Sequence, residues 1–263
     1  SAIDRRRAEQ ELRRSQEFIQ RVADASPNIL YIYDLQEQRN IYVNREITTL
    51  LGYTPGHVQA VGSNLLATLF HPDDLANIAN HHRRFDTMQE GEVVEIEYRV
   101  RDSEGNWHWF VSRDTLFART KDGKAKQIVG AASDITHRKQ TEEWFRLSER
   151  AIASSSNGIV ISDIRQRDRP LVFVNPAFER ITGYTPIEVL GRNCRFLQGE
   201  DRNQPEVDQL RQAVKEGKSC KVVLRNYRKD GSLFWNEIAI SPIHDAEGNL
   251  THYLGIQNDI TAF

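Results

Sequence analysis

Cysteine and long apolar runs are scarce in this 263-residue sequence, and both shortages exclude classes of protein. Only Cys194 and Cys220 occur, and they form no CxxC motif. This argues against a disulfide framework or a cysteine-rich metal site and suits a reducing cytosol. No apolar run approaches the roughly 20 residues of a membrane-spanning helix. The formal net charge of −2 predicts no strong attraction to nucleic acid or membrane. We therefore expect a cytoplasmic protein without nucleic-acid or membrane partners.

The sequence contains three blocks twice, in the same order. The block IYVNREITTLLGYTP, for example, returns as VFVNPAFERITGYTP. Because the order is kept, we infer two copies of one fold. The corresponding ranges are 41–55 and 172–186, 102–110 and 229–237, and 128–136 and 253–261.

Each copy has the pattern of an α+β domain. Two short strands come first, short helices with a Gly-Tyr-Thr-Pro turn follow, and a longer helix precedes three longer strands. Asp-Gly and Gly-Asn turns between apolar runs are typical of hairpins. We expect a five-stranded antiparallel sheet with helices on one face in each copy. The expected parts are an N-terminal helix at 1–25, a first domain at 26–136, a helical linker at 137–156 and a second domain at 157–263.

Two helical segments, at 5–23 and 137–153, carry apolar stripes. Their spacing by three and four residues places the stripes on single helix faces. We predict a homodimer formed through the N-terminal and linker helices, as in a short coiled coil. The alternative is that each helix only covers the sheet of its own domain. The stripe residues are Ala8, Leu12, Ser15, Ile19 and Val22, then Trp144, Leu147 and Ala151.

The stretch GRNCRFLQ, at 191–198, places a thiol among cationic and amide side chains. A lone cysteine is usually a small, inert, buried residue. Here Cys194 is flanked by Arg192 and Arg195, and arginine suits phosphate because its planar fork matches the oxygens. Arg211, on the longer helix, could complete a clamp with Arg195.

Three amides are expected on the closing strands. Asn226 and Asn236 lie on consecutive strands, and Gln257 lies on the last. Inward-facing amides can donate to and accept from a flat, heteroatom-rich ring. The phosphate clamp, the amides and the thiol together predict a phosphorylated heteroaromatic cofactor.

The hexapeptide NCRFLQ, at 193–198, resembles the signature of LOV photoreceptor domains, a flavin-binding branch of the PAS superfamily. The resemblance covers about 157–261, and Asn226, the Phe234-Trp235-Asn236 run and the Gly255-Ile256-Gln257 run also fit it. It implies a tandem PAS–LOV module that senses blue light. The short loop after Gln198 favours FMN over FAD as the cofactor.

The resemblance also implies roles for individual residues. Cys194 would form a reversible covalent bond with flavin carbon C4a in light. Gln257 would relay the change through the last strand to Asp259 and Thr261. The remaining roles are hydrogen bonds to the flavin from Asn193 and Gln198, phosphate binding by Arg195 and Arg211, pairing with the pyrimidine edge by Asn226 and Asn236, and ring contacts from Val160, Ser162, Leu197, Val207, Leu210, Ile238, Ile240 and Gly255.

The first copy lacks this set of residues. Leu65 stands where the second copy has Cys194, and Leu66 stands where it has Arg195. We expect a plain PAS domain with an empty core and a dimerising or relaying role. Its His81-His82 pair lies beside Arg83-Arg84, which predicts a solvated helix face.

Three alternatives to a photosensory module stay open. They are a flavin redox sensor, a PAS pair that only dimerises, and a cysteine-dependent enzyme, for which no histidine partner of Cys194 is recognisable. We expect a sensory fragment that is not itself an enzyme. Its output domain, absent from this sequence, would be a cyclase, a cyclic-dinucleotide enzyme or a histidine kinase.

Overall fold

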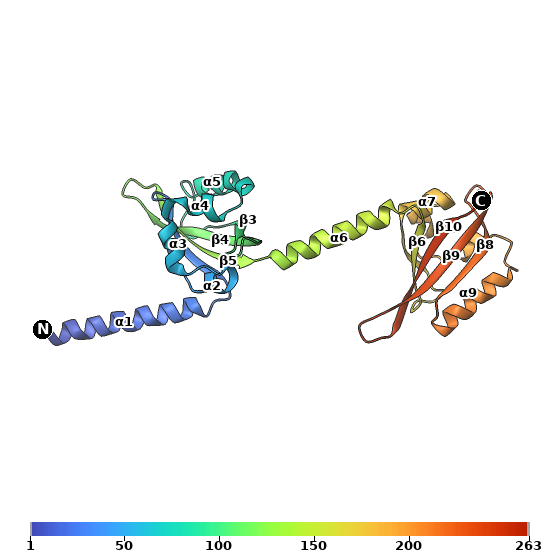
Figure 1. Cartoon of the computed structure of the whole chain (residues 1–263), viewed down its shortest axis with the longest axis horizontal. Helices are drawn as coiled ribbons and strands as arrows, with labels where there is room; N and C mark the ends of the chain where they lie inside the picture. The colour runs from blue at the N-terminus through green and yellow to red at the C-terminus, as the bar shows by residue number, and fades with distance from the viewer. Residues whose placement is uncertain (1, 262–263) are drawn as a thin grey trace. The chain divides into compact units, whose positions relative to one another are not determined.

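The computed structural model describes residues 2–261, which form two compact units that divide between Glu143 and Trp144 (Figure 1). Each unit contains one five-stranded antiparallel sheet. The strand orders, β2-β1-β5-β4-β3 and β7-β6-β10-β9-β8, are the same path followed twice. The predicted α+β fold is therefore confirmed. Residue 1 and residues 262–263, the outer ends of the first and last predicted ranges, lie outside the described residues.

The first unit has its short helices between the second and third strands. The longer helix predicted before the last three strands begins after a 3-10 turn at Pro72–Asp74 and ends at Arg84. The elements are α1 (Ala2–Asp24), β1 (Ile29–Asp34), β2 (Arg39–Val43), α2 (Glu46–Leu51), α3 (Pro55–Val61), α4 (Leu65–Leu69), α5 (Leu75–Arg84), β3 (Val93–Arg101), β4 (Trp107–Arg119) and β5 (Ala125–Asp134).

The second unit follows the same order, and one helix, α6 (Thr136–Ser154), spans the division between the units. The other elements are β6 (Gly158–Asp163), β7 (Leu171–Val174), α7 (Pro176–Thr182), α8 (Pro186–Val189), the 3-10 helix η3 (Cys194–Gln198), α9 (Pro205–Glu216), β8 (Cys220–Tyr227), β9 (Leu233–His244) and β10 (Leu250–Asp259).

The repeated block fixes the same strand-to-helix corner in both units. Asn175 caps α7 by accepting from the backbone N–H of Phe178 at 3.1 Å, and it also accepts from Ile159 at 2.8 Å. Asn44 binds Leu30 in the same way at 2.9 Å. Each helix then ends at a glycine in the left-handed region, at φ +76°, where a side chain would be strained (Gly52 and Gly183). The shared Asn and Gly therefore give both units the same strand-to-helix corner, and α7 alone of the two helices has a side-chain cap.

The strand registers show which positions of the two sheets are equivalent. Gly130 lies between Tyr31 of β1 and Asp114 of β4. Gly255 lies in the same way between Val160 of β6 and Ile240 of β9. Tyr31 and Asp114 thus occupy the positions that Val160 and Ile240 occupy in the second unit.

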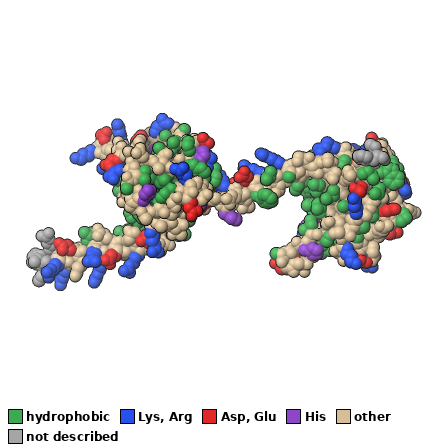
Figure 2. Space-filling model, viewed as in Figure 1, with side chains coloured by type: hydrophobic (Ala, Val, Ile, Leu, Met, Phe, Trp, Pro, Cys, Tyr) green, Lys and Arg blue, Asp and Glu red, His purple; other side chains and the backbone are tan. Residues whose placement is uncertain are grey.

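The apolar stripes of the two long helices are exposed. Leu12, Ile19 and Val22 of α1 are exposed, as are Trp144 and Leu147 of α6, where Figure 2 shows hydrophobic side chains at the surface. No described residue of α6 is buried. The helix therefore does not use this stripe to cover a sheet, and the homodimer stays a prediction. Among residues 2–261, no helix combines the length and the apolar character needed to cross a membrane.

Candidate cofactor site

A cavity of about 240 Å³ lies in the second unit between the sheet, η3 and α9. Most of the residues expected to hold the cofactor line it. Two are not among the lining residues: Leu197 packs into the adjacent apolar cluster, and Asn236 is fully buried and bonded to Asn226, which lines the cavity. The expected residues that line the cavity are Val160, Ser162, Asn193, Cys194, Arg195, Gln198, Val207, Leu210, Arg211, Asn226, Ile238, Ile240, Gly255 and Gln257.

Cys194 is the first residue of η3, and its sulfur contacts the last strand. The η3 turn is fixed by Asn193, whose side chain accepts from the backbone N–H of Arg195 at 3.0 Å. The Gln257 amide nitrogen donates to Cys194 Sγ at 3.4 Å. Burial raises the pKa of the Cys194 thiol to about 11, although the bond from Gln257 favours the thiolate. The thiol therefore keeps its proton at neutral pH.

The three predicted amides form a connected network. Asn236 Nδ2 donates to Asn226 Oδ1 at 2.9 Å and to Gln257 Oε1 at 3.3 Å. Asn226 Nδ2 donates to the carbonyl of Arg225 at 2.9 Å. The oxygen Asn236 Oδ1 is buried and has no hydrogen-bond partner. Since buried polar groups are nearly always paired, this acceptor calls for an N–H donor from a bound molecule.

Gly255 keeps the sheet side of the cavity free of a side chain. A Cβ at this position would lie 2.8 Å from Val160 Cγ2, closer than Cβ contacts normally come. Any larger residue would have to displace Val160, which itself lines the cavity. A flat ring can therefore approach the backbone of β10 here.

The predicted phosphate clamp lies at the polar side of the lining. Arg195 forms an ion pair with Asp168, and Arg211 pairs with Asp208 at 2.8 Å. Both arginine side chains are at least half exposed. Exposed ion pairs are worth little, so either guanidinium can exchange its carboxylate for a phosphate.

Family models match both units. A model described as PAS domain matches residues 156–262, and one described as PAS fold matches residues 40–132. The chain belongs to the PAS family. Together with the residues of the cavity and the relatives below, this defines a PAS–LOV module whose second PAS domain is the LOV domain.

The similar proteins include light receptors. The blue-light photoreceptor of Listeria monocytogenes is 48% identical over 117 residues, which are 44% of this chain and 46% of that protein. The bacterioopsin transcriptional activator of Halobacterium salinarum is 46% identical over 144 residues, which are 55% of this chain and 20% of that protein. This PAS–LOV chain thus spans less than half the length of either relative. The relatives support a blue-light sensory function.

Solved structures include the LOV domain of the blue-light activated histidine kinase from Erythrobacter litoralis EL346. It is 42% identical, and the match covers 40% of this chain and 96% of that one with a TM-score of 0.38.

Five residues of the LOV cavity lining were not predicted. Leu224 alternates with Asn226 on β8, so the period of two could have placed it on the same face. Arg169 had no such signal, because it lies in the loop between β6 and β7 with a positive φ of 51°. The missed residues are Ile164, Arg169, Val214, Leu224 and Tyr253.

The prediction of a solvated His81-His82 face in the first PAS domain is wrong. His81 is buried, and its Nε2 lies 2.6 Å from Asp114 Oδ2. His82 stacks on Tyr33 with ring centroids 5.2 Å apart. Burial and the neighbouring His81 lower the pKa of His82 to about 4. The side of α5 that carries His81 packs on the sheet, because Asp114, the hydrogen-bond partner of His81, lies on β4.

Proposed function

We propose that the LOV domain binds FMN and that Cys194 forms a reversible covalent bond with it under blue light. The observation that carries the proposal is a thiol in the wall of a cavity, in contact with an amide of the last strand. A flavin in this cavity would supply the light-absorbing ring.

The other residues fit a flavin of this kind. Asn236 Oδ1, which lacks a partner, would accept from a ring N–H, with Asn226 beside it on the neighbouring strand. Arg195 and Arg211 would hold a terminal phosphate. Asn193 and Gln198 would bind polar atoms of the flavin next to the thiol. Arg195 and Arg211, both at least half exposed, would bind a single terminal phosphate. Because FMN carries one phosphate, this supports FMN as the cofactor.

The thiol alone could supply both groups that the proposed reaction adds to the flavin. Cys194 would give its sulfur to ring carbon C4a and its proton to ring nitrogen N5, so no oxidant or reductant would be needed. In darkness the carbon–sulfur bond would break and the proton would return to Cys194. Burial favours this route, because it keeps on the sulfur the proton that the reaction moves.

Gln257 is placed to respond to this change. Its Nε2 donates to Cys194 and its Oε1 accepts from Asn236. When Cys194 is consumed and N5 gains a proton, a rotation of the amide would present Oε1 to the new N–H. An unpaired buried polar group costs about 1–3 kcal/mol, which is enough to shift a two-state equilibrium about tenfold.

The relay would continue along β10. Gln257 lies two residues before Asp259, whose carboxylate binds Arg228 at 2.6 Å and caps the turn at Thr261. We propose that the signal leaves through this end of the strand to an output domain outside this sequence. The exposed stripes of α1 and α6 support a homodimer as the arrangement in which it is passed on.

The purified chain is expected to be yellow and to bleach reversibly in blue light. The measurement is a light-minus-dark absorbance spectrum followed by recovery in darkness. A colourless protein reconstituted with FMN without spectral change would contradict flavin binding. A yellow protein that shows only flavin reduction, and only with added reductant, would favour the redox-sensor alternative.

Gln257→Leu is expected to keep the reversible bleaching and to lose the structural response, because leucine offers neither the donor nor the acceptor. Light-minus-dark infrared difference spectra in the amide region, or hydrogen exchange of β10, would measure the response. Gln212→Leu, at an exposed position of α9 outside the cavity, is the control and should respond like the unmodified chain. An unchanged response in Gln257→Leu would contradict the relay.

A further inference from the structure

A third arginine lines the LOV cavity in addition to Arg195 and Arg211. This residue, Arg169, belongs to the loop at 164–170 that connects β6 to β7. Of the described residues that line the cavity, three are arginines and none is a lysine, an aspartate or a glutamate. The three arginines come from the loop, η3 and α9, so separate elements bring positive charge to one cavity.

Arg169 has an unusual backbone conformation. Its φ is +51° and that of the preceding Asp168 is +67°, in the left-handed region that residues other than glycine rarely adopt. Within residues 2–261, Gln38 is the one further residue of this kind. Such conformations persist where surrounding contacts impose them, and they are concentrated at ligand sites. The contacts of this loop therefore need an explanation beyond a solvated turn.

Both neighbours of Arg169 in the chain are anchored. The Asp168 carbonyl accepts from Asn193 Nδ2 at 2.6 Å, and the Asp168 carboxylate pairs with Arg195. On the other side, Pro170 is buried, and its carbonyl accepts from the last backbone N–H of β6 at 3.0 Å. The loop is thus tied to η3 and to the sheet, and Arg169 lies between these two points.

The charges around the proposed phosphate clamp favour a third cation. Arg195 and Arg211 lie beside Asp168 and Asp208, so each of these ion pairs is neutral. Among residues 2–261, no carboxylate forms an ion pair with Arg169. A phosphate monoester carries about 1.5–2 negative charges at neutral pH. A phosphate bound between two neutral pairs therefore needs a further positive charge, and Arg169 supplies it.

Tyr253 indicates which side of the cavity Arg169 approaches. Burial raises the pKa of the Tyr253 phenol, and the nearby positive charge of Arg169 opposes this rise. The phenol oxygen lies 3.1 Å from the carbonyl oxygens of Ala213 and Lys218, near the C-terminal end of α9. Arg169 therefore lies toward α9, the helix that carries Arg211.

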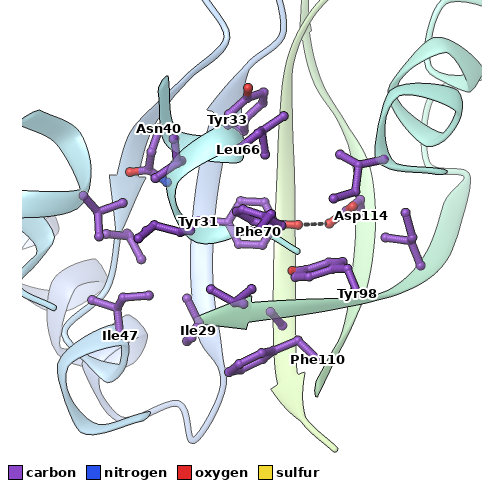
Figure 3. A pocket seen from close by; sticks show the side chains of 18 of the residues that line it. Ile29, Tyr31, Tyr33, Asn40, Ile47, Leu66, Phe70, Tyr98, Phe110 and Asp114 are labelled. Carbon is purple, nitrogen blue, oxygen red and sulfur yellow. Dashed lines mark hydrogen bonds between the residues drawn. The ribbon is translucent and has the colours of Figure 1, made fainter. Parts of the chain in front are cut away.

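The first PAS domain has no counterpart of this arginine. Its equivalent loop, at 35–38, is shorter and contains no arginine, and no described residue lining its own cavity is an arginine or a lysine. Figure 3 shows that cavity, where Tyr31 donates to Asp114 at 2.5 Å. The Tyr31 hydroxyl also lies 2.8 Å from Ser112, so a buried network occupies the space. The third arginine thus accompanies the copy that carries the flavin signature.

We propose that Arg169 is a third phosphate-binding residue of the LOV domain, and that it sets the preference of the cavity for FMN over riboflavin, which lacks the phosphate. The inference rests on the proposed flavin binding. Arg169 donates to the phosphate oxygens beside Arg195 and Arg211, and such charge-assisted hydrogen bonds are roughly twice as strong as neutral ones. Arg169 binds the cofactor and takes no part in the chemistry at Cys194.

The test is titration of the full chain, prepared free of flavin, with FMN and with riboflavin, followed by flavin fluorescence. The unmodified chain is expected to prefer FMN. Arg169→Gln should reduce this preference by about tenfold and leave the affinity for riboflavin unchanged, because it removes a contact with the phosphate alone. Arg169→Glu, which brings a like charge to the phosphate, should reduce the preference further. Riboflavin also reports folding, since it needs the same cavity.

Arg167→Gln is the matched control, because Arg167 is exposed in the same loop but does not line the cavity. It should keep the preference, whereas Arg211→Gln should reduce it. A reduced preference in Arg211→Gln but not in Arg169→Gln would overturn the role of Arg169 and leave the proposed function standing. Equal losses in Arg169→Gln and Arg167→Gln would also overturn that role, because they would reflect the charge of the loop as a whole. A chain that binds neither flavin would overturn both proposals.

Discussion

Cys194→Ala is expected to abolish the reversible bleaching completely while the protein stays yellow. The variant removes the sulfur that forms the covalent bond, but it leaves the amides of Asn226 and Asn236 and the arginine clamp in place. Binding of the flavin therefore persists, whereas the light-induced loss of its absorbance should fall to the noise level. Light-minus-dark spectra of both proteins at equal flavin loading measure the effect.

Cys220→Ala is the matched control for this experiment. Cys220 begins β8 and lines a surface groove near α9, outside the flavin cavity. Its removal changes the thiol content by the same amount and should leave the amplitude of bleaching unchanged. A normal photocycle in Cys194→Ala, or a lost one in Cys220→Ala alone, would contradict the assignment of the photoactive thiol.

Asp114→Ala is expected to destabilise the first PAS domain by about 3–5 kcal/mol. The carboxylate is 2% exposed and is bound by Tyr31 at 2.5 Å and by His81 at 2.6 Å. Removing it leaves the buried imidazole of His81 without this partner and leaves the Tyr31 hydroxyl with Ser112 alone, and no water can replace the carboxylate without entering the core. Chemical denaturation followed by tryptophan fluorescence measures the change, since Trp107 and Trp109 lie on β4 of the same domain.

Glu95→Ala provides the comparison for Asp114→Ala. Glu95 also pairs across β3 and β4, with Arg113 at 3.1 Å, but both side chains are more than half exposed. Its loss should change the free energy of unfolding by less than about 1 kcal/mol. A change of similar size in the two variants would show that the buried network does not stabilise the domain.

The sequence predicted best the features that are encoded locally. Two domains followed from repeated blocks because each block carries an Asn that binds the first strand and a Gly that ends the helix in the left-handed region, as Asn44 and Gly52 show. Most residues of the cofactor cavity were predicted from the hexapeptide NCRFLQ and from side chains on β8, β9 and β10. Sequence did not show that Leu197 and Asn236 are outside the lining: Leu197 lies in the 3-10 helix η3, and the alternation along β9 gives the face of Asn236 but not its depth.

The features that sequence missed depend on partners far along the chain. His81 was assigned to a solvated face because its neighbours are arginines, whereas its environment is set by Asp114, 33 residues away on β4. Polar residues such as Ser112 and Asp114 in a strand normally indicate the solvent side. Only the sheet register, which sets Asp114 beside Gly130 and near Tyr31, shows that they face inward.

The two sheets have a glycine at the equivalent position, Gly130 and Gly255, and this has a consequence for engineering. At Gly130 an added Cβ would lie 2.0 Å from an oxygen of Asp114 and 2.5 Å from the ring of Tyr31. These two side chains therefore fill the space that is open above Gly255 in the second domain. Introducing a cysteine at position 65 would therefore not create a second light-responsive domain. Tyr31 and Asp114 would first have to be exchanged for smaller, apolar residues, and the histidine they support would need a new environment.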